Sequence, residues 1–160
     1  MAGFAVAIAA GAALAVAEGS QHWLGFVPCA FCLLERWPWR VVVVLGLLAA
    51  VMRRGSAGRG VLLLSVLALL AAAGLAFVHV GVEQGLWPSP LPECAAPELH
   101  GNNIAELLAS MPARPSKPCD APSFLIPGLP LSMAAMNLLY ALVVCGGLVA
   151  YLARSREEAR

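Results

Sequence analysis

The sequence predicts an all-α membrane protein, a bundle of four transmembrane helices with a short amphipathic interfacial helix in its second exported loop. Hydrophobic residues make up 61% of the 160 residues and charged residues only 12%, far from the balance of a soluble globular protein. The apolar residues fall into four long runs, and arginines collect in short segments between or after them. The length suits one domain, so residues 1–160 are expected to form a single membrane domain.

Each apolar run is predicted to be one membrane span. A helix needs roughly 17–25 apolar residues to cross the hydrocarbon core; the third and fourth runs satisfy this, and the first two need flanking residues. The first run ends like a signal peptide at Ala15-Val16-Ala17, but no basic region precedes it, so we expect it to be retained. The predicted spans are about 2–19, 35–53, 61–82 and 131–152, with exported loops about 20–34 and 83–130.

The distribution of arginines predicts the orientation. The segment Arg53–Arg59 joins the second and third spans and is purely basic, and the tail carries Arg154, Arg156 and Arg160. Short basic loops remain in the cytoplasm. The other two loops then face the exported side, and they contain four of the five cysteines: Cys29, Cys32, Cys94 and Cys119.

Charge and cysteine usage narrow the class of function. The net charge is +1, which predicts neither nucleic-acid binding nor a polybasic membrane anchor. Four cysteines outside the apolar runs indicate an oxidising compartment or a metal site. Cys145, inside the fourth run, is expected to be a buried apolar side chain.

The second exported loop contains a predicted interfacial helix. Asn103 is placed to cap it, with Glu106 three residues later as in a capping box. Such a helix lies in the membrane interface or packs against the exported end of the bundle. Its apolar residues recur at helical spacing: Ile104, Leu107, Leu108 and Met111.

The segment Pro28–Arg36 carries the most chemical information. Cys29 and Cys32 form a CxxC pair at a predicted helix start, where a thiolate is stabilised. From Cys32, Arg36 and Arg40 follow at i+4 and i+8 on one helical face. Arg36 is expected to donate to a carbonyl oxygen of an electron acceptor. The alternative is an interfacial arginine or an ion pair with a carboxylate such as Glu35.

The cysteines also allow structural interpretations. One is a pair of stabilising disulfides, and another is a zinc site made by Cys29, Cys32, Cys94 and Cys119. Structural zinc favours two closely spaced pairs, whereas Cys94 and Cys119 are 25 positions apart. We therefore expect no metal.

Several other polar and aromatic residues receive structural predictions. His79 and Glu83 are spaced i, i+4 near the exported end of the third span and are expected to form a packed polar pair, with tuning of the cysteine site as the alternative. Asn137 is expected to make an interhelical hydrogen bond. Four tryptophans flank the apolar runs and are predicted to be interfacial anchors: Trp23, Trp37, Trp39 and Trp87.

The segment Pro28-Cys29-x-x-Cys32-x-x-Glu35-Arg36 resembles the signature of the DsbB family of disulfide-bond formation proteins. The likeness covers nearly the whole chain, with four spans and a second cysteine pair in the second exported loop. Trp87-Pro88-Ser89-Pro90 before Cys94 adds to it, as do the stretches from His79 to Glu83 and from Gly128 to Asn137. The sequence departs from the family pattern in two places. Ala30-Phe31 stands where aliphatic residues are common, and no basic residues precede the first span.

The resemblance implies an electron relay in a bacterial inner membrane. A DsbA-like periplasmic thioredoxin-fold partner would attack Cys94 of a Cys94–Cys119 disulfide, and Cys119 would pass electrons to the Cys29–Cys32 pair. Cys32 would stand beside ubiquinone or menaquinone, with Arg36 next to the quinone ring. The protein is expected to act as a monomer, in contact with lipid and quinone.

Two rival functions remain at this stage. A vitamin K epoxide reductase-like protein also links cysteines to quinone, but its CxxC lies at the last helix, whereas here the CxxC comes first. The other rival is a non-catalytic membrane protein with structural disulfides or zinc.

Overall fold

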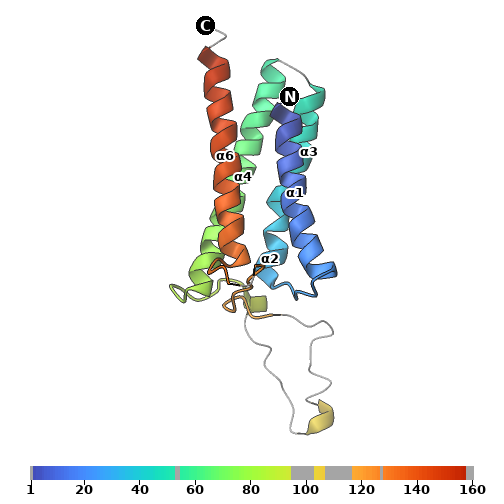
Figure 1. Cartoon of the computed structure of the whole chain (residues 1–160), viewed down its shortest axis with the longest axis vertical. Coiled ribbons are helices and arrows are strands. Elements are labelled where there is room, and N and C mark those ends of the chain that lie inside the picture. The colour runs from blue at the N-terminus through green and yellow to red at the C-terminus, as the bar shows by residue number, and fades with distance from the viewer. Residues whose placement is uncertain (1, 53–54, 95–102, 107–116, 127, 158–160) are drawn as a thin grey trace.

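The computed structural model describes residues 2–52, 55–94, 103–106, 117–126 and 128–157, and every regular element in these ranges is helical. Four long helices run side by side in up-down order (Figure 1). A short helix precedes the second long one, and a 3-10 turn lies in the connection after the third. The elements are α1 (Ala2–His22), α2 (Ala30–Leu34), α3 (Arg36–Val51), α4 (Ser56–Glu83), η1 (Pro92–Cys94) and α6 (Met133–Glu157).

Glycines allow α1 and α3 to touch backbone to backbone. A Cβ atom added at Gly3 would lie 2.6 Å from the backbone nitrogen of Ala50, and one added at Gly46 would lie 2.8 Å from that of Ala7. Such distances are far below ordinary van der Waals contact. Small residues at a helix interface are typical of membrane bundles, where close backbone approach maximises packing.

The bundle has many small side chains in its core and many large apolar ones on its outer surface. Alanines of three helices are fully buried together with Val42 and Leu69, and other large apolar residues are exposed. In water such an apolar surface would be a strong liability, whereas lipid solvates it. The buried set includes Ala10, Ala72, Ala76 and Ala141, and the exposed set includes Val44, Leu63, Leu67 and Val143.

Three helices of the described chain are long and apolar enough to cross a membrane: α1, α4 and the segment Met133–Ser155 of α6. The predicted second span, about 35–53, corresponds to α3, which has only 16 residues and is not among them. The all-helical class is therefore confirmed for the described residues, and three of the four predicted spans are matched by helices that could cross a membrane.

Pro38 explains why the second span is short. In a continuous helix the N–H of residue 38 would donate to the carbonyl oxygen of Leu34, and proline has no N–H. The helix accordingly divides, with α2 ending at Leu34 and α3 beginning at Arg36. Glu35 lies between them in helical conformation, and its N–H still donates to the Phe31 carbonyl at 2.9 Å.

The ends of α1 and α4 lie at one end of the bundle (Figure 1). We call this the cysteine end, because it carries α2, η1 and Cys119. The starts of α1 and α4 and the ends of α3 and α6 lie at the opposite end. Only part of the predicted interfacial helix is described: residues 104–106 are helical, and the Asn103 Oδ1 accepts from the Glu106 N–H at 2.9 Å, as a cap. Leu107, Leu108 and Met111 lie outside the described residues.

Candidate active site

The CxxC pair starts a helix, as predicted. Cys29 occupies the N-cap position of α2 in extended conformation, and its Sγ accepts from the Cys32 N–H at 3.1 Å. Both residues are free thiols, with Cys29 buried and Cys32 partly exposed. The group that caps the helix is therefore itself a free thiol.

The two thiols have opposite acidities. The hydrogen bond from the Cys29 side chain lowers the pKa of Cys32 to about 7, against the opposing effect of burial. The same hydrogen bond, together with burial, raises the pKa of Cys29. At neutral pH the pair thus holds one proton firmly on Cys29, while Cys32 is partly thiolate.

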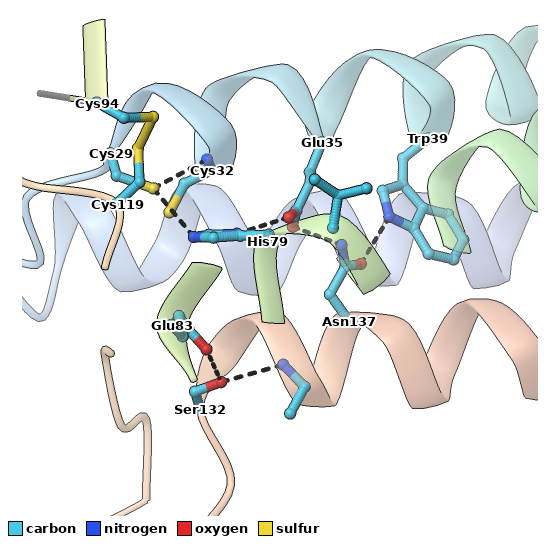
Figure 2. Close-up of polar contacts among 12 residues, drawn as sticks. Cys29, Cys32, Glu35, Trp39, His79, Glu83, Cys94, Cys119, Ser132 and Asn137 are labelled. Carbon is cyan, nitrogen blue, oxygen red and sulfur yellow. Dashed lines mark hydrogen bonds and ion pairs between the residues drawn. A yellow bond between two sulfur atoms is a disulfide. The ribbon is translucent and has the colours of Figure 1, made fainter. Parts of the chain in front are cut away.

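A chain of hydrogen bonds links Cys29 to the middle of the bundle (Figure 2). The Trp39 Nε1–H donates to Asn137 Oδ1 at 2.9 Å, and the Asn137 Nδ2 donates to Glu35 Oε2 at 2.7 Å. Glu35 Oε1 lies 2.7 Å from His79 Nδ1, and His79 Nε2 lies 3.5 Å from the Cys29 Sγ. Residues of α3, α6 and α4 thus converge on a cysteine of the α2 start.

Trp39 and Glu35 together determine the direction of the bonds in this chain. Indole nitrogen is only a donor, so the Asn137 oxygen must face it and the Asn137 nitrogen must face Glu35. Because the Glu35 carboxylate only accepts, His79 carries a proton on Nδ1. In the neutral imidazole Nε2 is then a bare acceptor facing the Cys29 sulfur.

The structure corrects the predicted His79–Glu83 pair. His79 is 3% exposed and pairs with Glu35, while the Phe31 ring stacks on its imidazole with centroids 5.1 Å apart. Glu83 instead accepts from the Ser132 hydroxyl of the α6 start. The i, i+4 spacing was misleading, because the two residues face partners on different elements.

Cys94 and Cys119 form a disulfide. It lies in a buried apolar cluster with Cys29, Phe31 and Val82, and Figure 2 shows it next to Cys29. Two sulfurs bonded to each other are not available as ligands, so the four-cysteine zinc interpretation is wrong for this structure. The Sγ atoms of Cys29 and Cys32 and a ring nitrogen of His79 do lie within 4.8 Å of one another, which makes metal analysis a necessary control.

An apolar pocket of about 300 Å³ opens beside Cys32, at the lower limit of typical ligand-binding pockets. Its wall comes from all four long helices, from α2, and from the segments that precede α2 and α6. Apolar side chains dominate it. The polar or reactive residues in the wall include Gln21, Cys32, Glu35, Arg36, His79 and Asn137.

Arg36 lies in this wall with one donor unused. Its Nη1 forms an ion pair with Glu18 Oε1 of α1 at 3.0 Å, and its Nη2 donates to the Ala17 carbonyl at 3.3 Å. Its Nε is buried without a hydrogen-bond partner in the described part of the chain. Arg40 reaches the same Glu18 oxygen at 3.5 Å but is half-exposed.

These contacts revise the prediction made for Arg36 and Arg40. The ion-pair alternative is correct in kind, but the partner is Glu18 and not Glu35, which binds His79 and Asn137. The single carboxylate of Glu18 holds both guanidinium groups. Arg36 combines this ion pair with a position in the pocket wall, so the two interpretations of it are compatible.

Comparison with known proteins identifies the family. The family model described as Disulfide bond formation protein DsbB matches residues 1–151. The chain belongs to the DsbB family. It is therefore a membrane oxidoreductase of disulfide-bond formation, in a family that is generally linked to quinone and to a DsbA-like partner.

A relative in Rickettsia prowazekii (strain Madrid E), the uncharacterized protein RP370, is 26% identical over 148 residues, which cover 91% of this chain and 84% of the relative. No solved structure matches the chain. The DsbB-family assignment therefore rests on the family model.

Four tryptophans were predicted to be anchors of this DsbB-family bundle, and one of these predictions is wrong. Trp39 is 3% exposed and donates to Asn137, whereas Trp23 and Trp37 are 87% and 61% exposed. Trp87 donates to the Val78 carbonyl at 3.0 Å. The interhelical role of Asn137 and the burial of Cys145 are both confirmed.

Glu18 is the residue of this site that the sequence analysis missed. It is the one acidic residue in the first 34 positions, and it ends an otherwise apolar run. An acidic residue at membrane depth needs a cationic partner. That signal, set beside Arg36 and Arg40, was sufficient to predict the α1–α3 ion pair.

Proposed function

We propose that this DsbB-family protein is an inner-membrane disulfide oxidase that reoxidises a DsbA-like periplasmic dithiol and delivers the electrons to a membrane quinone. The observation that carries the proposal is the position of the CxxC pair. Cys29 lies in one buried cluster with the Cys94–Cys119 disulfide, and Cys32 lies in the wall of the apolar pocket. The pair thus connects a disulfide to a lipophilic ligand site.

The relay begins at the exported disulfide. The partner's thiolate attacks Cys94, and Cys119 leaves. Because Cys94 and Cys119 are 6% and 1% exposed, the incoming thiolate must displace neighbouring groups to reach the bond. Cys119 then attacks Cys29 of the Cys29–Cys32 disulfide, and Cys32 leaves as a thiolate in the wall of the pocket.

The pocket residues fit a quinone head group. The wall is mostly apolar, and the unpartnered Nε of Arg36 supplies a buried donor for a carbonyl oxygen. Glu18 holds the guanidinium in place, and Cys32 stands in the same wall. Ubiquinone or menaquinone bound there would supply the sink for two electrons and two protons.

The energetics favour such a sink. A strong thioredoxin-fold oxidant such as DsbA has a reduction potential of about −120 mV, far above the potential of a glutathione pool. Glutathione cannot keep it oxidised, so an acceptor of higher potential is required. A quinone dissolved in the bilayer is reached only from within the membrane, which accounts for a relay built on membrane helices.

The function also requires that the cysteine end face the periplasm, with α3 as a fourth span. The Arg53–Arg59 segment and the C-terminus then lie in the cytoplasm. A single cysteine placed at Ser56, in a variant with the native cysteines replaced, should be labelled by an impermeant maleimide only after cells are opened. Labelling of intact cells would contradict the four-span arrangement.

Purified protein in quinone-containing nanodiscs provides the direct functional test. It should oxidise a reduced DsbA-like partner and reduce about one quinone per disulfide formed. Cys32→Ser should retain the Cys94–Cys119 disulfide and lose turnover. Metal analysis of the same sample distinguishes the oxidase from a structural zinc protein. Stoichiometric zinc together with no quinone reduction would contradict the oxidase proposal and favour the structural zinc protein.

A further inference from the structure

Cys29 is a poor nucleophile in its resting environment. Its side chain is 3% exposed, and the hydrogen bond with Cys32 together with burial raises the pKa of its thiol. The thiolate is the form that takes part in disulfide exchange. A buried neutral thiol between two redox pairs therefore needs a group that accepts its proton and later returns it.

His79 has the geometry of that group. Its Nε2 lies 3.5 Å from the Cys29 Sγ, within the range of a hydrogen bond to sulfur. Its Nδ1 proton is held by Glu35 at 2.7 Å, so the Nε2 lone pair faces the thiol. A base oriented by a carboxylate on its other nitrogen repeats the logic of catalytic triads.

Glu35 is itself held from the opposite side. Asn137 donates to its second oxygen, and Trp39 fixes the orientation of the Asn137 amide. The stacked Phe31 ring restrains the imidazole plane. Four residues of different elements thus determine which nitrogen of His79 meets Cys29, and this degree of support exceeds what a simple core histidine needs.

We propose that His79 is the acid–base group for Cys29 and that Glu35 is the residue that positions it. The inference rests on the proposed relay and adds a proton carrier to it. It assigns a role to the residues that link the CxxC pair to the bundle interior.

The exchange step shows what the imidazole does. Cys29 attacks the Cys119 sulfur, the Cys29–Cys119 bond forms, and the Cys94–Cys119 bond breaks with its electron pair on Cys94. The Cys29 proton moves to His79 Nε2, which leaves an imidazolium and a Cys94 thiolate. No net oxidation occurs. In the direction of the relay the same step runs backwards, and His79 returns the proton to Cys29 as it leaves.

Other charged groups near His79 are few in the described structure. The α2 start presents Cys29 and Cys32, and the α2–α3 junction presents Glu35. Glu83 of the same helix acts on His79 through its charge and is hydrogen-bonded to Ser132 of the α6 start. The charge of Lys117, in the segment before α6, acts in turn on Glu83. Glu83 therefore offers a matched control for the neutralisation of Glu35.

The test uses full-length protein in quinone-free micelles with Cys32→Ser and Cys145→Ala, so that Cys29 is the only free thiol beside the Cys94–Cys119 disulfide. A small maleimide traps sulfurs released by exchange, and mass spectrometry reports the rate at which Cys94 becomes labelled. At pH 7, adding His79→Gln should slow this labelling by about 100-fold, the lower range for loss of an acid–base group. Glu35→Gln should slow it by about tenfold, and Glu83→Gln by less than about twofold.

The pH profile separates chemistry from packing. Without the base, labelling should rise about tenfold per pH unit between pH 6 and 8, because only pre-formed thiolate reacts. With His79 present the rise should be much flatter. If His79→Gln labels Cys94 at the same rate as the parent variant and with the same pH dependence, the assignment of His79 is overturned while the relay stays intact. Absence of Cys94 labelling in the parent variant would instead overturn the relay, and the assignment with it.

Folding is checked in the same samples. Each variant should retain the Cys94–Cys119 disulfide and the melting temperature of the parent within a few degrees. If His79→Gln fails this check, Glu35→Gln decides the question, because it keeps the size of the side chain and removes only its charge. A Glu35→Gln rate and pH profile equal to the parent's would contradict the positioning role.

Discussion

The two cysteine pairs lie in one buried cluster but are surrounded differently. The Cys29–Cys32 pair sits at a helix start, with its sulfurs facing a backbone N–H, an imidazole and the pocket. The Cys94–Cys119 pair joins η1 to a loop and is covered by the apolar side chains of Phe31 and Val82. One pair is surrounded by groups that change its ionisation, and the other by groups that only pack.

This difference indicates a division of labour. A pair that exchanges with another protein needs only a bond that a thiolate can attack, because the partner brings its own activated sulfur. A pair that passes electrons to a quinone must separate charge and protons inside the membrane. The polar groups should therefore matter for the first pair and hardly at all for the second.

Replacement of Arg36 should produce the largest effect in this comparison. Loss of a charged hydrogen bond to a quinone carbonyl removes about 1.5–3 kcal/mol, so Arg36→Gln should raise the apparent KM for quinone about 10- to 150-fold. The KM for the reduced partner should not change. Arg40→Gln is the matched control, since Arg40 shares the Glu18 ion pair but is half-exposed. If Arg36→Gln and the wild type had equal kinetics, the proposed role of Arg36 in quinone binding would be contradicted.

The acidity of Cys32 offers a second contrast. Its folded pKa of about 7 lies below the ordinary thiol value of about 8.5, so its thiolate is present above pH 7 and is lost as the pH falls through 7. Alkylation of Cys32 by iodoacetamide in reduced, quinone-free protein should follow this midpoint. At pH 7 it should react roughly 15-fold faster, relative to its own high-pH limit, than an ordinary thiol. A midpoint near 8.5 would show that the pair is not activated.

The smallest effect is expected from Trp39. Trp39→Phe removes one buried hydrogen bond, so the free energy of unfolding should fall by about 1 kcal/mol. Trp37→Phe, two residues earlier and exposed, should have no such effect. Denaturant titration in detergent measures both. Equal stabilities of the two variants would mean that the indole N–H does not support the chain from Asn137 to His79.

The helices were predictable because hydrophobicity along the chain determines them. The runs that became α1, α4 and α6 need no tertiary information, and the position of the CxxC pair at a helix start was predicted as well. The division at Glu35 was also visible in principle, because Pro38 removes a helix hydrogen bond. It was missed because Cys32, Arg36 and Arg40 were placed on one face of a single unbroken helix.

The polar chain was not predictable from local patterns. Its contacts join residues 44, 50, 98 and 102 positions apart, and only the packing of four helices brings them together. The sequence offered closer candidates: Glu83 for His79, Glu35 for Arg36, and the headgroup region for Trp39. In each case a partner on another helix took the place of the one nearby in sequence.

The central claim is that Cys94 receives the partner and Cys119 alone passes the electrons on to the CxxC pair. It is tested most directly by Cys119→Ser. Because this variant lacks the thiol that the account assigns to resolving Cys94, a mixed disulfide between Cys94 and the thioredoxin-fold partner should persist.

Mass spectrometry of non-reduced Cys119→Ser protein, mixed with oxidised partner, should find that covalent complex joined through Cys94. The complex should disappear on reduction and in the double variant that also carries Cys94→Ser. A complex joined through Cys29, or full quinone-linked turnover by Cys119→Ser, would contradict the account.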